Sequence, residues 1–474
     1  MADQYKMYLG GEWVDSAREI RVESPYDDSL LGLVAAASRE SFAAAIDRAQ
    51  SAFERTRELP AYVRERVCRA IANGLEQDAG KFARTMSLEL GKAIKDSRAE
   101  VNRAIGVFRT SAEEAKRIGG ELIDLDWNVG SEGRMGLVRR FPRGVIGAIT
   151  PFNFPLNLVS HKIGPAIASG NSIVLKPASK TPIIALMLAE LIDATEYPKG
   201  AISILPAGAA EASPLLEDDR VKLITFTGSA DVGWWIKAHC GAKPVVLELG
   251  GNAGVVVADD ADLEYAITRL LFGTFGVAGQ SCISVQRIYV HDSIYDRFIH
   301  MFVDRVKKLK VGNPLDDETD IGALVDTTAV ENTLASIREA VLGGARLLVG
   351  GNARGRLMEP TLLTDTKTSM AVCSKEIFAP VGIIEKYYTF EEAVAAINNS
   401  EYGLQAGLFT NRMKDIMYAF RRIECGGVVI NDVPTYRVDQ MPYGGMKRSG
   451  MGREGVRYAI EDMTEPKLLV MNPR

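Results

Sequence analysis

The most constraining feature of this chain is the recurrence of short apolar runs, each followed by helical sequence or by Gly and Pro. Between Gly144 and Leu249 these runs are GVIGAIT, SIVLKP, AISIL, KLITFTG and VVLEL. A second series begins near Gly251 with AGVVVA and continues with RIYVHD, LLVGG, VGIIEKY and GGVVIN. Buried parallel strands have such continuous apolar sequences, and their alternation with helices is typical of βαβ units. The pattern predicts an α/β protein with two open parallel-sheet domains.

The sequence outside these runs predicts how the domains are completed. Residues 40–118 contain amphipathic stretches with apolar residues at helical spacing, and residues 119–143 alternate around a Gly-Ser turn, as a hairpin would. The final stretch EDMTEPKLLVMNPR has the sequence of a terminal strand that leaves the domain body, and we expect a neighbouring subunit to pair with it. The predicted units are a first domain of residues 1–118 and 144–250, a second domain of residues 251–430, and a small β bridging element of residues 119–143 and 456–474.

Length and charge narrow the classes of partner. A chain of 474 residues exceeds what one hydrophobic core usually organises, which agrees with two large domains. A net charge of -5 leaves no cationic surplus to neutralise phosphates, so we expect neither nucleic acid nor a membrane as partner. The N-terminal sequence lacks the pattern of a signal peptide, and no window is long and apolar enough to span a bilayer. These observations predict a cytoplasmic protein that binds small molecules.

The cysteines and histidines argue against disulfide and metal chemistry. The 5 cysteines are odd in number, widely spaced and without a CxxC pair. They are Cys68, Cys240, Cys282, Cys373 and Cys425. The 4 histidines include no HxxxH pair, so we predict no metal site. Any chemistry is therefore expected to depend on side chains or on an organic cofactor.

Cys282 is the candidate nucleophile. It lies in GVAGQSCIS, a Gly-rich turn between an amphipathic helix and a strand, where small neighbours leave room for a ligand. An isolated cysteine is more commonly a small buried apolar residue, and that interpretation fits Cys68, Cys240 and Cys425. No histidine is close to Cys282 in sequence, so backbone dipoles or a cofactor's positive charge would have to activate its thiolate.

Two further residues could support a nucleophile. Glu248 ends the apolar run in KPVVLELGGN, and the carboxyl end of a buried strand faces the ligand cleft of an open α/β sheet. Partial burial would raise its pKa and suit it to general-base catalysis, although it could instead cap a helix. Asn153, between two prolines in TPFNFP, is either an Asx-turn former or a rigid amide donor to an oxyanion.

Two segments could bind a cofactor. FTGSADVG follows a predicted strand and opens a helix, so its backbone N–H groups could meet a pyrophosphate, although it is not GxGxxG and could be an ordinary turn. Lys176 ends the run SIVLKP, where it could reach ribose hydroxyls or phosphate, or extend into solvent.

The order and wording of these motifs resemble the aldehyde dehydrogenase superfamily over nearly the whole chain. The matching segments are GGEW, PFNFP, LKPAS, FTGS, LELGG, GQSC, EIFAP and PYGGMKRSGMGREG. The resemblance implies that Cys282 is the nucleophile, that Glu248 is the base for deacylation, and that Asn153 forms the oxyanion hole with the Cys282 backbone N–H. It further implies that the first domain binds the cofactor, that the second is catalytic, and that the bridging element joins subunits into a homodimer or homotetramer.

The resemblance also implies an NAD or NADP site. It assigns Lys176 and Glu376 to the ribose hydroxyls and Phe378 to the nicotinamide side. The full implied set is Thr150, Phe152, Lys176, Ser179, Gly228, Ser229, Gly233, Leu249, Glu376 and Phe378. Ser179 stands where relatives that prefer NAD often carry a glutamate that would repel a 2′-phosphate, so we expect NADP to be tolerated.

The expected substrate is a small polar or anionic aldehyde. The resemblance places His161 on the helix lining the aldehyde tunnel. Within the family the chain resembles the branch of lactaldehyde, non-phosphorylating glyceraldehyde-3-phosphate and phosphonoacetaldehyde dehydrogenases, and Arg109 and Arg437 occupy positions that resemble anion-binding arginines in the last two. Arginine suits phosphate, phosphonate, sulfonate or carboxylate, while the alternative for Arg437 is a structural ion pair, for instance with Asp439. Ser281 replaces an arginine that phosphate-specific relatives carry before the nucleophile, which argues against a strongly phosphate-specific pocket.

Two alternatives remain at this point. A CoA-acylating dehydrogenase would share the fold and the cysteine but release the thioester to CoA, and Glu248 argues against it because such relatives tend to lack the glutamate. A binding or structural protein on the same scaffold is the second alternative, since a fold by itself does not determine function.

Overall fold

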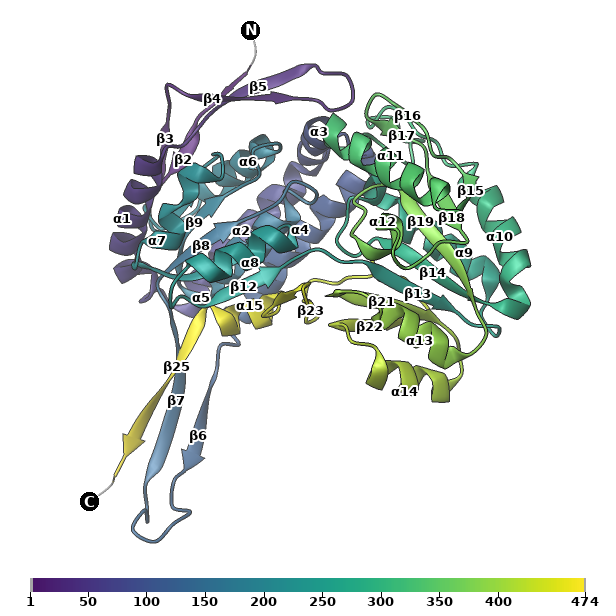
Figure 1. Ribbon diagram of the computed structural model, residues 1–474. Coiled ribbons are helices and arrows are strands. Elements are labelled where there is room, and N and C mark those ends of the chain that lie inside the picture. The colour runs from purple at the N-terminus through teal and green to yellow at the C-terminus, as the bar shows by residue number, and fades with distance from the viewer. Residues whose placement is uncertain (1–2, 473–474) are drawn as a thin grey trace.

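The computed structural model describes residues 3–472, so the outermost residues of the predicted first domain and bridging element, 1–2 and 473–474, lie outside the described residues. Figure 1 shows two lobes, each built on a central sheet with helices on both faces, and a long three-stranded arm that projects from the first lobe. The fold class predicted from the apolar runs is confirmed. In the described chain, no helix is both long and apolar enough to cross a membrane.

The first sheet has eight strands in the order β24-β12-β11-β8-β9-β10-β2-β3. Its five central strands, β12 to β10 in this order, are parallel, and the outer strands are antiparallel to their neighbours. The strands are β2 (Met7–Leu9), β3 (Glu12–Val14), β8 (Val145–Ile149), β9 (Ser172–Lys176), β10 (Ile202–Ile204), β11 (Val221–Thr227), β12 (Val245–Glu248) and β24 (Gly450–Met451). Residues 431–455, which the predicted domains leave unassigned, return to this first sheet through β24.

Alternating side chains of the first sheet enter two separate cores. Ile146 and Ile173 pack with helices α2 to α6, whereas Val145 and Val174 pack with α1, α7 and α8 on the opposite face. The helices are α1 (Arg39–Thr56), α2 (Ala61–Gln77), α3 (Ala79–Leu90), α4 (Ile94–Glu114), α5 (Asn157–Ser169), α6 (Pro182–Asp193), α7 (Pro214–Glu217) and α8 (Ala230–His239). Because both faces are covered, the central strands are largely apolar.

The second sheet has seven strands in the order β15-β18-β19-β14-β13-β21-β22, parallel except for β15. Val255 and Ile288 pack with α9 to α12 on one face, and Val256 and Ala406 pack with α13 and α14 on the other. The strands are β13 (Ala253–Val257), β14 (Val285–His291), β15 (Arg346–Val349), β18 (Thr361–Thr364), β19 (Val381–Tyr387), β21 (Gln405–Phe409) and β22 (Gly427–Ile430). The helices are α9 (Leu263–Phe275), α10 (Asp292–Val306), α11 (Thr327–Leu342), α12 (Ala371–Ser374), α13 (Phe390–Asn398) and α14 (Met413–Arg422).

The arm is an antiparallel sheet of β6 (Gly120–Asp124), β7 (Met135–Pro142) and β25 (Thr464–Met471). The C-terminal strand finds its partner in its own chain, because β25 pairs with β7 along its full length; a neighbouring subunit is not needed for this pairing. Helix α15 (Val456–Asp462), which lies within the predicted bridging element, packs against α4 and α5 through Val456 and Ile460. The C-terminal part of the arm therefore begins at Thr464, where β25 starts.

Short elements complete the chain. A three-stranded sheet near the N-terminus joins β1 (Gln4–Tyr5), β5 (Leu30–Ala35) and β4 (Glu19–Glu23). Two-stranded ladders pair β16 (Ala353–Arg354) with β17 (Leu357–Met358), and β20 (Tyr402–Gly403) with β23 (Met446–Lys447). The short helices are η1 (Ala210–Ala212) and η2 (Gly276–Gly279).

Candidate active site

The candidate site is a cavity of about 500 Å³ lined by residues of both lobes. The first lobe contributes the carboxyl ends of neighbouring strands, because Asn153 follows β8, Ser229 follows β11 and Glu248 ends β12. This edge of a parallel sheet is where open α/β folds bind ligands. The second lobe contributes Cys282 and the segment from Thr435 to Tyr443.

Cys282 follows a strained turn between α9 and β14. Val277 and Ala278 both have positive φ values of 55° and 53°, which are unfavourable for residues with a side chain. The carboxylate of Asp96 on α4 accepts the N–H of Val277 at 3.0 Å and so holds this turn against the first lobe. The thiol is partly exposed to the cavity, and burial raises its pKa to about 12 despite a hydrogen bond with Tyr443.

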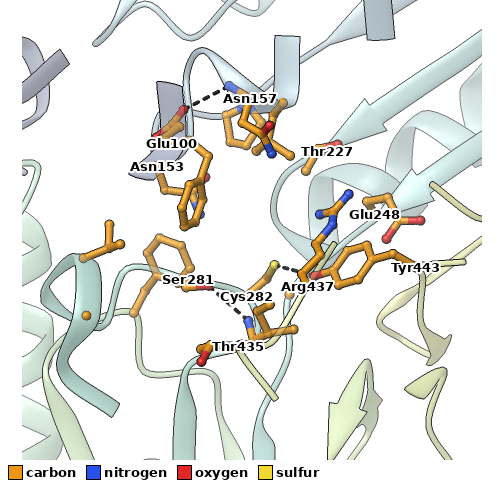
Figure 2. Close-up of a pocket in the computed structure, with 18 of the residues that line it drawn as sticks. Glu100, Asn153, Asn157, Thr227, Glu248, Ser281, Cys282, Thr435, Arg437 and Tyr443 are labelled. Carbon is orange, nitrogen blue, oxygen red and sulfur yellow. Dashed lines mark hydrogen bonds between the residues drawn. The ribbon is translucent and has the colours of Figure 1, made fainter. Parts of the chain in front are cut away.

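Asn153 lies across the cavity from Cys282 (Figure 2). Its amide Nδ2 donates to the backbone carbonyl of Gln280, next to the cysteine loop, at 3.0 Å. An amide group carries two N–H bonds, so one remains for a ligand. The backbone carbonyl of Asn153 accepts from Lys92 Nζ at 3.0 Å, and Lys92 is itself paired with Glu100 at 2.5 Å. A buried ion pair therefore fixes the loop that carries this amide.

Glu248 is buried at the end of β12, and neither of its carboxylate oxygens has a hydrogen-bond partner in the structure. Burial, and next to it the negative charge of Glu454, raise the pKa of Glu248 well above its ordinary range, while Lys162 and Arg437 oppose this shift. A carboxylate without partners beside a cavity is available to take a proton from a water molecule.

Arg437 extends along the wall of the cavity beside Tyr443 (Figure 2). It donates to Glu454 at 2.8 Å, and its guanidinium carbon lies 3.8 Å from the centre of the Tyr443 ring. Its Nε is buried without a hydrogen-bond partner. Glu454 also accepts from Lys162 at 2.5 Å, so an arginine and a lysine share this carboxylate.

The comparisons with known proteins identify the family. The sequence profile of the aldehyde dehydrogenase family matches residues 13–469. A 3-sulfolactaldehyde dehydrogenase of Priestia megaterium is 44% identical over 470 residues, which cover 99% of this chain and 98% of that protein. This chain belongs to the aldehyde dehydrogenase family.

Solved aldehyde dehydrogenase structures agree with this assignment. Aldehyde dehydrogenase 21 of Physcomitrella patens, in complex with the reaction product succinate, superimposes with a TM-score of 0.98 at 44% identity, covering 99% of this chain and 98% of that one. The glyceraldehyde-3-phosphate dehydrogenase GapN of Methanocaldococcus jannaschii, complexed with NADP, has a TM-score of 0.92 at 40% identity, covering 96% and 99%.

Most of the residues predicted to bind the dinucleotide lie at or after the carboxyl ends of strands of the first sheet of this aldehyde dehydrogenase, whereas Glu376 and Phe378 come from the second lobe. Lys176 ends β9, Thr150 follows β8, and Gly228 and Ser229 follow β11, with Gly233 inside α8 and Leu249 after β12. Phe152 and Phe378 meet edge to face across the cavity, with ring centres 6.0 Å apart. Ser179 is exposed beyond β9. Of the ten predicted residues, six line the cavity, namely Phe152, Gly228, Ser229, Leu249, Glu376 and Phe378.

The local chemistry of this edge fits a nucleotide. The hydroxyl of Thr150 is buried without a hydrogen-bond partner. Burial raises the pKa of Glu376 to about 7 and lowers the pKa of Lys176 to about 8, so both groups are poorly solvated. A Cβ added to Gly250 would lie 2.2 Å from Glu376 Oε2, so this glycine lets the carboxylate approach the backbone. Hydroxyl groups of a ribose could satisfy these groups.

The structure corrects the prediction that Arg109 contacts the substrate, because Arg109 does not line the cavity. It is exposed and pairs with Glu76 on α2, with 2.7 Å between Arg109 Nη2 and Glu76 Oε2. Arg103, on the same helix α4, lines the cavity instead. Six residues of α-helix correspond to a rotation of about 600°, which turns the two side chains to different faces.

The structure also corrects the prediction that His161 contacts the substrate. Its side chain is fully buried behind the cavity wall, with Nε2 2.9 Å from Asp439 and 3.4 Å from Arg437. It does not line the cavity around Cys282, whereas Ser281 and Arg437 do. Arg437 is in a buried ion pair, which agrees with the alternative of a structural pair, although its partner is Glu454 and not Asp439; Asp439 pairs with His161 and Arg103.

Several site residues were missed from the sequence. Tyr443 and Glu454 stand inside the motif PYGGMKRSGMGREG, but nothing local to that motif distinguishes them. Glu100 carried a usable signal, because a carboxylate on the apolar face of a helix is seldom buried without a partner. Lys92 and Arg103 carried none, since a lysine or arginine in a helical region is usually exposed.

Proposed function

We propose that this aldehyde dehydrogenase oxidises a small aldehyde with an anionic group to the carboxylic acid, using NAD or NADP, through a thioester on Cys282. The observation that carries the proposal is the meeting of Cys282, Asn153 and Glu248 at one cavity, although they come from separate elements in two lobes. A nucleophile, an oxyanion donor and a base are the three functions that thioester formation and hydrolysis require.

Each of these residues has a definite part in the proposed reaction. The Cys282 thiolate attacks the carbonyl carbon, and the resulting oxyanion accepts hydrogen bonds from the Asn153 amide and the Cys282 backbone N–H. When bound, the oxidised nicotinamide supplies a hydride acceptor. Glu248 then takes a proton from water as the water oxygen attacks the thioester, the C–S bond breaks, and the acid leaves with Cys282 again a thiolate.

The dinucleotide would be held by the edge of the first sheet. The buried Thr150 hydroxyl, Lys176 and Glu376 suit ribose hydroxyls, while Gly228 and Ser229 at the start of α8 suit the pyrophosphate. Ser179 and Lys180 are exposed next to β9 and place no carboxylate of their own there. We therefore propose that NADP is accepted as well as NAD.

The arginines of the cavity support an anionic substrate. Arg103, Arg269 and Arg437 line it, and Arg437 has a buried Nε without a partner. A carboxylate or sulfonate on the substrate could accept from such a group in a charge-assisted hydrogen bond. Two similar proteins agree with an anionic substrate, because one is named a 3-sulfolactaldehyde dehydrogenase and the other was solved in complex with its reaction product succinate.

The test compares aldehydes of matched length with and without an anionic group, such as succinic semialdehyde and butyraldehyde, with each cofactor. We expect kcat/KM to favour the charged aldehyde, and Arg103→Met to reduce that preference about tenfold or more, as expected for a lost charged hydrogen bond. Arg109→Met is the matched control, because it removes an exposed arginine from the same helix. A parent enzyme that prefers the neutral aldehyde would overturn the anionic substrate.

Two further variants test the chemistry. Cys282→Ala should abolish reduction of the cofactor, and Glu248→Gln should retain a first burst of reduction while losing steady turnover, because only hydrolysis needs the base. Turnover that persists in Cys282→Ala would overturn the assignment. A requirement for CoA in the parent would show that the thioester is released to CoA and not to water.

We also propose that the arm joins subunits into a homodimer or homotetramer. Its strand β25 exposes Leu468, Leu469 and Val470, and the hairpin exposes Leu122 and Trp127. β25 and β6 are edge strands of the arm sheet, and exposed apolar edge strands are typical of protein interfaces.

The odd number of well-separated cysteines supports a cytoplasmic enzyme.

A further inference from the structure

Tyr443 contacts the atom on which the proposed chemistry depends. Its hydroxyl oxygen lies 3.1 Å from Cys282 Sγ, although the two residues are 161 positions apart (Figure 2). The tyrosine is buried, and its ring packs with Ile283, Leu404 and Cys282 in a small cluster at the base of the cavity. This hydroxyl has no role in the oxyanion hole, the base or the cofactor site described above.

The position of the hydroxyl is determined from two directions. The backbones of Tyr443 and Glu454 form two hydrogen bonds. The Tyr443 N–H donates to the Glu454 carbonyl at 2.9 Å, and the Glu454 N–H donates to the Tyr443 carbonyl at 2.6 Å. The guanidinium of Arg437 lies over the ring at 3.8 Å from its centre, and Arg437 is held by the same Glu454. Because the backbone and the ring face are both held, rotation of the side chain away from Cys282 is disfavoured.

The chemistry of the pair decides which group donates. A phenol ordinarily loses its proton at higher pH than a thiol, with pKa values of about 10 and 8.5. Burial, and next to it Cys282, raise the pKa of Tyr443 well above its ordinary range, so the hydroxyl keeps its proton when the thiol ionises. Arg437 over the ring withdraws electron density and makes the hydroxyl a better donor.

The thiolate needs such a donor in this cavity. Burial is the largest cause that raises the pKa of Cys282, and the carboxylates of Glu376 and Glu248 raise it further. The groups that lower it are Tyr443, through its hydrogen bond, and Arg437, through its charge. No histidine of the described residues lines the cavity, so the thiol is not paired with an imidazole there.

We propose that the Tyr443 hydroxyl donates a hydrogen bond to the Cys282 sulfur and so stabilises the thiolate before it attacks. Arg437 and Glu454 act as positioning residues for the tyrosine. This inference rests on the proposed function of Cys282 as the nucleophile. It adds a residue to the activation of the thiolate, a step to which neither Asn153 nor Glu248 contributes. The tyrosine stays neutral and transfers no proton; it stabilises the thiolate before the C–S bond forms and again when that bond breaks.

The test measures the reactivity of Cys282 without any aldehyde. Parent, Tyr443→Phe and the matched control Tyr436→Phe are alkylated with iodoacetamide at pH 8, and the modified fraction of the peptide containing Cys282 is followed by mass spectrometry. Tyr436 also lines the cavity but has no hydrogen bond to the thiol, and the phenylalanine at 443 keeps the ring under Arg437.

We expect Tyr443→Phe to react about threefold more slowly than the parent and Tyr436→Phe to react at the parent rate. Loss of a hydrogen bond to a charged group should raise the thiol pKa by about one unit, which reduces the thiolate fraction about tenfold. A less acidic thiol is a stronger nucleophile, and this offsets about a factor of three. If the tyrosine merely covered the thiol, the variant would react at the parent rate or faster, and that result would overturn the proposal.

A single-turnover experiment separates this inference from the proposed function. In Tyr443→Phe the first burst of cofactor reduction should slow more than thioester hydrolysis does, because the attack of water depends on Glu248, which is unchanged, and only the departure of the thiolate depends on Tyr443. A slowed hydrolysis with a normal burst would also overturn the role of Tyr443. A parent enzyme that shows no burst with any aldehyde would instead contradict the proposed function, whatever the alkylation rates.

Discussion

Lys92 and Glu100 form an ion pair whose side chains are both fully buried, with Nζ 2.5 Å from Oε2, directly beneath the loop that carries Asn153. Glu100 also accepts the backbone N–H groups of Leu156 and Asn157 at 2.9 Å and 3.0 Å, so it stabilises the start of α5. The ammonium of Lys92 lies 4.0 Å from the centre of the Phe154 ring. This pair links helix formation to the placement of the proposed oxyanion donor.

Lys92→Met should destabilise the enzyme strongly. It leaves the Glu100 carboxylate buried without its cation, and breaking a buried pair in this way costs about 3–5 kcal/mol. The measurement is the urea midpoint of the first unfolding transition. Lys95→Met is the control, because Lys95 pairs with Asp320 at the partly exposed surface, where we expect a change of about 1 kcal/mol or less. Equal midpoints for the two variants would contradict the structural role of the pair.

Glu454→Gln should move the acid limb of thioester hydrolysis to lower pH. The carboxylate of Glu454 raises the pKa of Glu248, and Gln removes that negative charge while Lys162 and Arg437 remain to favour ionised Glu248. Hydrolysis needs Glu248 ionised, so it increases as pH rises through the pKa of Glu248, and a lower pKa shifts this increase to lower pH. The hydrolysis rate is measured from pH 5 to 9, and circular dichroism shows whether the variant is folded. An unchanged or upward-shifted limb would contradict the coupling.

Ser179→Glu should impair the use of NADP much more than the use of NAD. A carboxylate near the 2′-phosphate repels its charge of nearly two by about 2 kcal/mol even at the dielectric of water, which corresponds to roughly thirtyfold in binding. KM for each cofactor is the measurement, and Ser179→Gln is the control of similar size without charge. A parallel loss of NADP binding in the glutamine variant would indicate a steric effect in place of charge repulsion.

Leu469→Lys should reduce the mass of the assembly in solution. Leu469 is 56% exposed on β25, next to Leu468 and Val470, and its substitution would place a charge in the proposed subunit interface. Light scattering after size exclusion reports the mass. Leu342→Lys is the control, because Leu342 is 89% exposed at the end of α11, far from the arm in the fold (Figure 1). An unchanged mass for Leu469→Lys would contradict assembly through the arm.

Sequence patterns predicted the parts of the site that follow directly from strand ends. Asn153, Glu248 and Lys176 each stand at or just after an apolar run, and the sheet order places these ends side by side. Parallel strands in one sheet point their carboxyl ends to the same edge, so a local signal becomes a spatial one. Cys282 also lines the cavity, and its Gly-rich turn between a helix and a strand is visible in the sequence.

The sequence did not predict the direction of side chains on helices, or which strand the C-terminal strand pairs with. Arg109 and Arg103 differ only in which face of α4 they occupy, and packing of α4 against α2 and α5 sets that face. The resemblance placed His161 on the helix lining the aldehyde tunnel, but its side chain lies behind the cavity wall, where it contacts Asp439 and Arg437. Strand β25 pairs with β7 of its own chain, which no local pattern distinguishes from pairing with another subunit.

The sequence by itself determined the α/β class, the family motifs and the thiol, amide and carboxylate proposed for catalysis, because these follow from hydrophobic periodicity and from residues at strand ends. Only the tertiary structure decided that Arg103 reaches the cavity in place of Arg109, that Glu454 holds both Arg437 and Lys162, and that Tyr443 touches Cys282. The physical reason is that these relationships join segments far apart in the chain, and their geometry depends on how the two lobes and the return from residues 431–455 pack together.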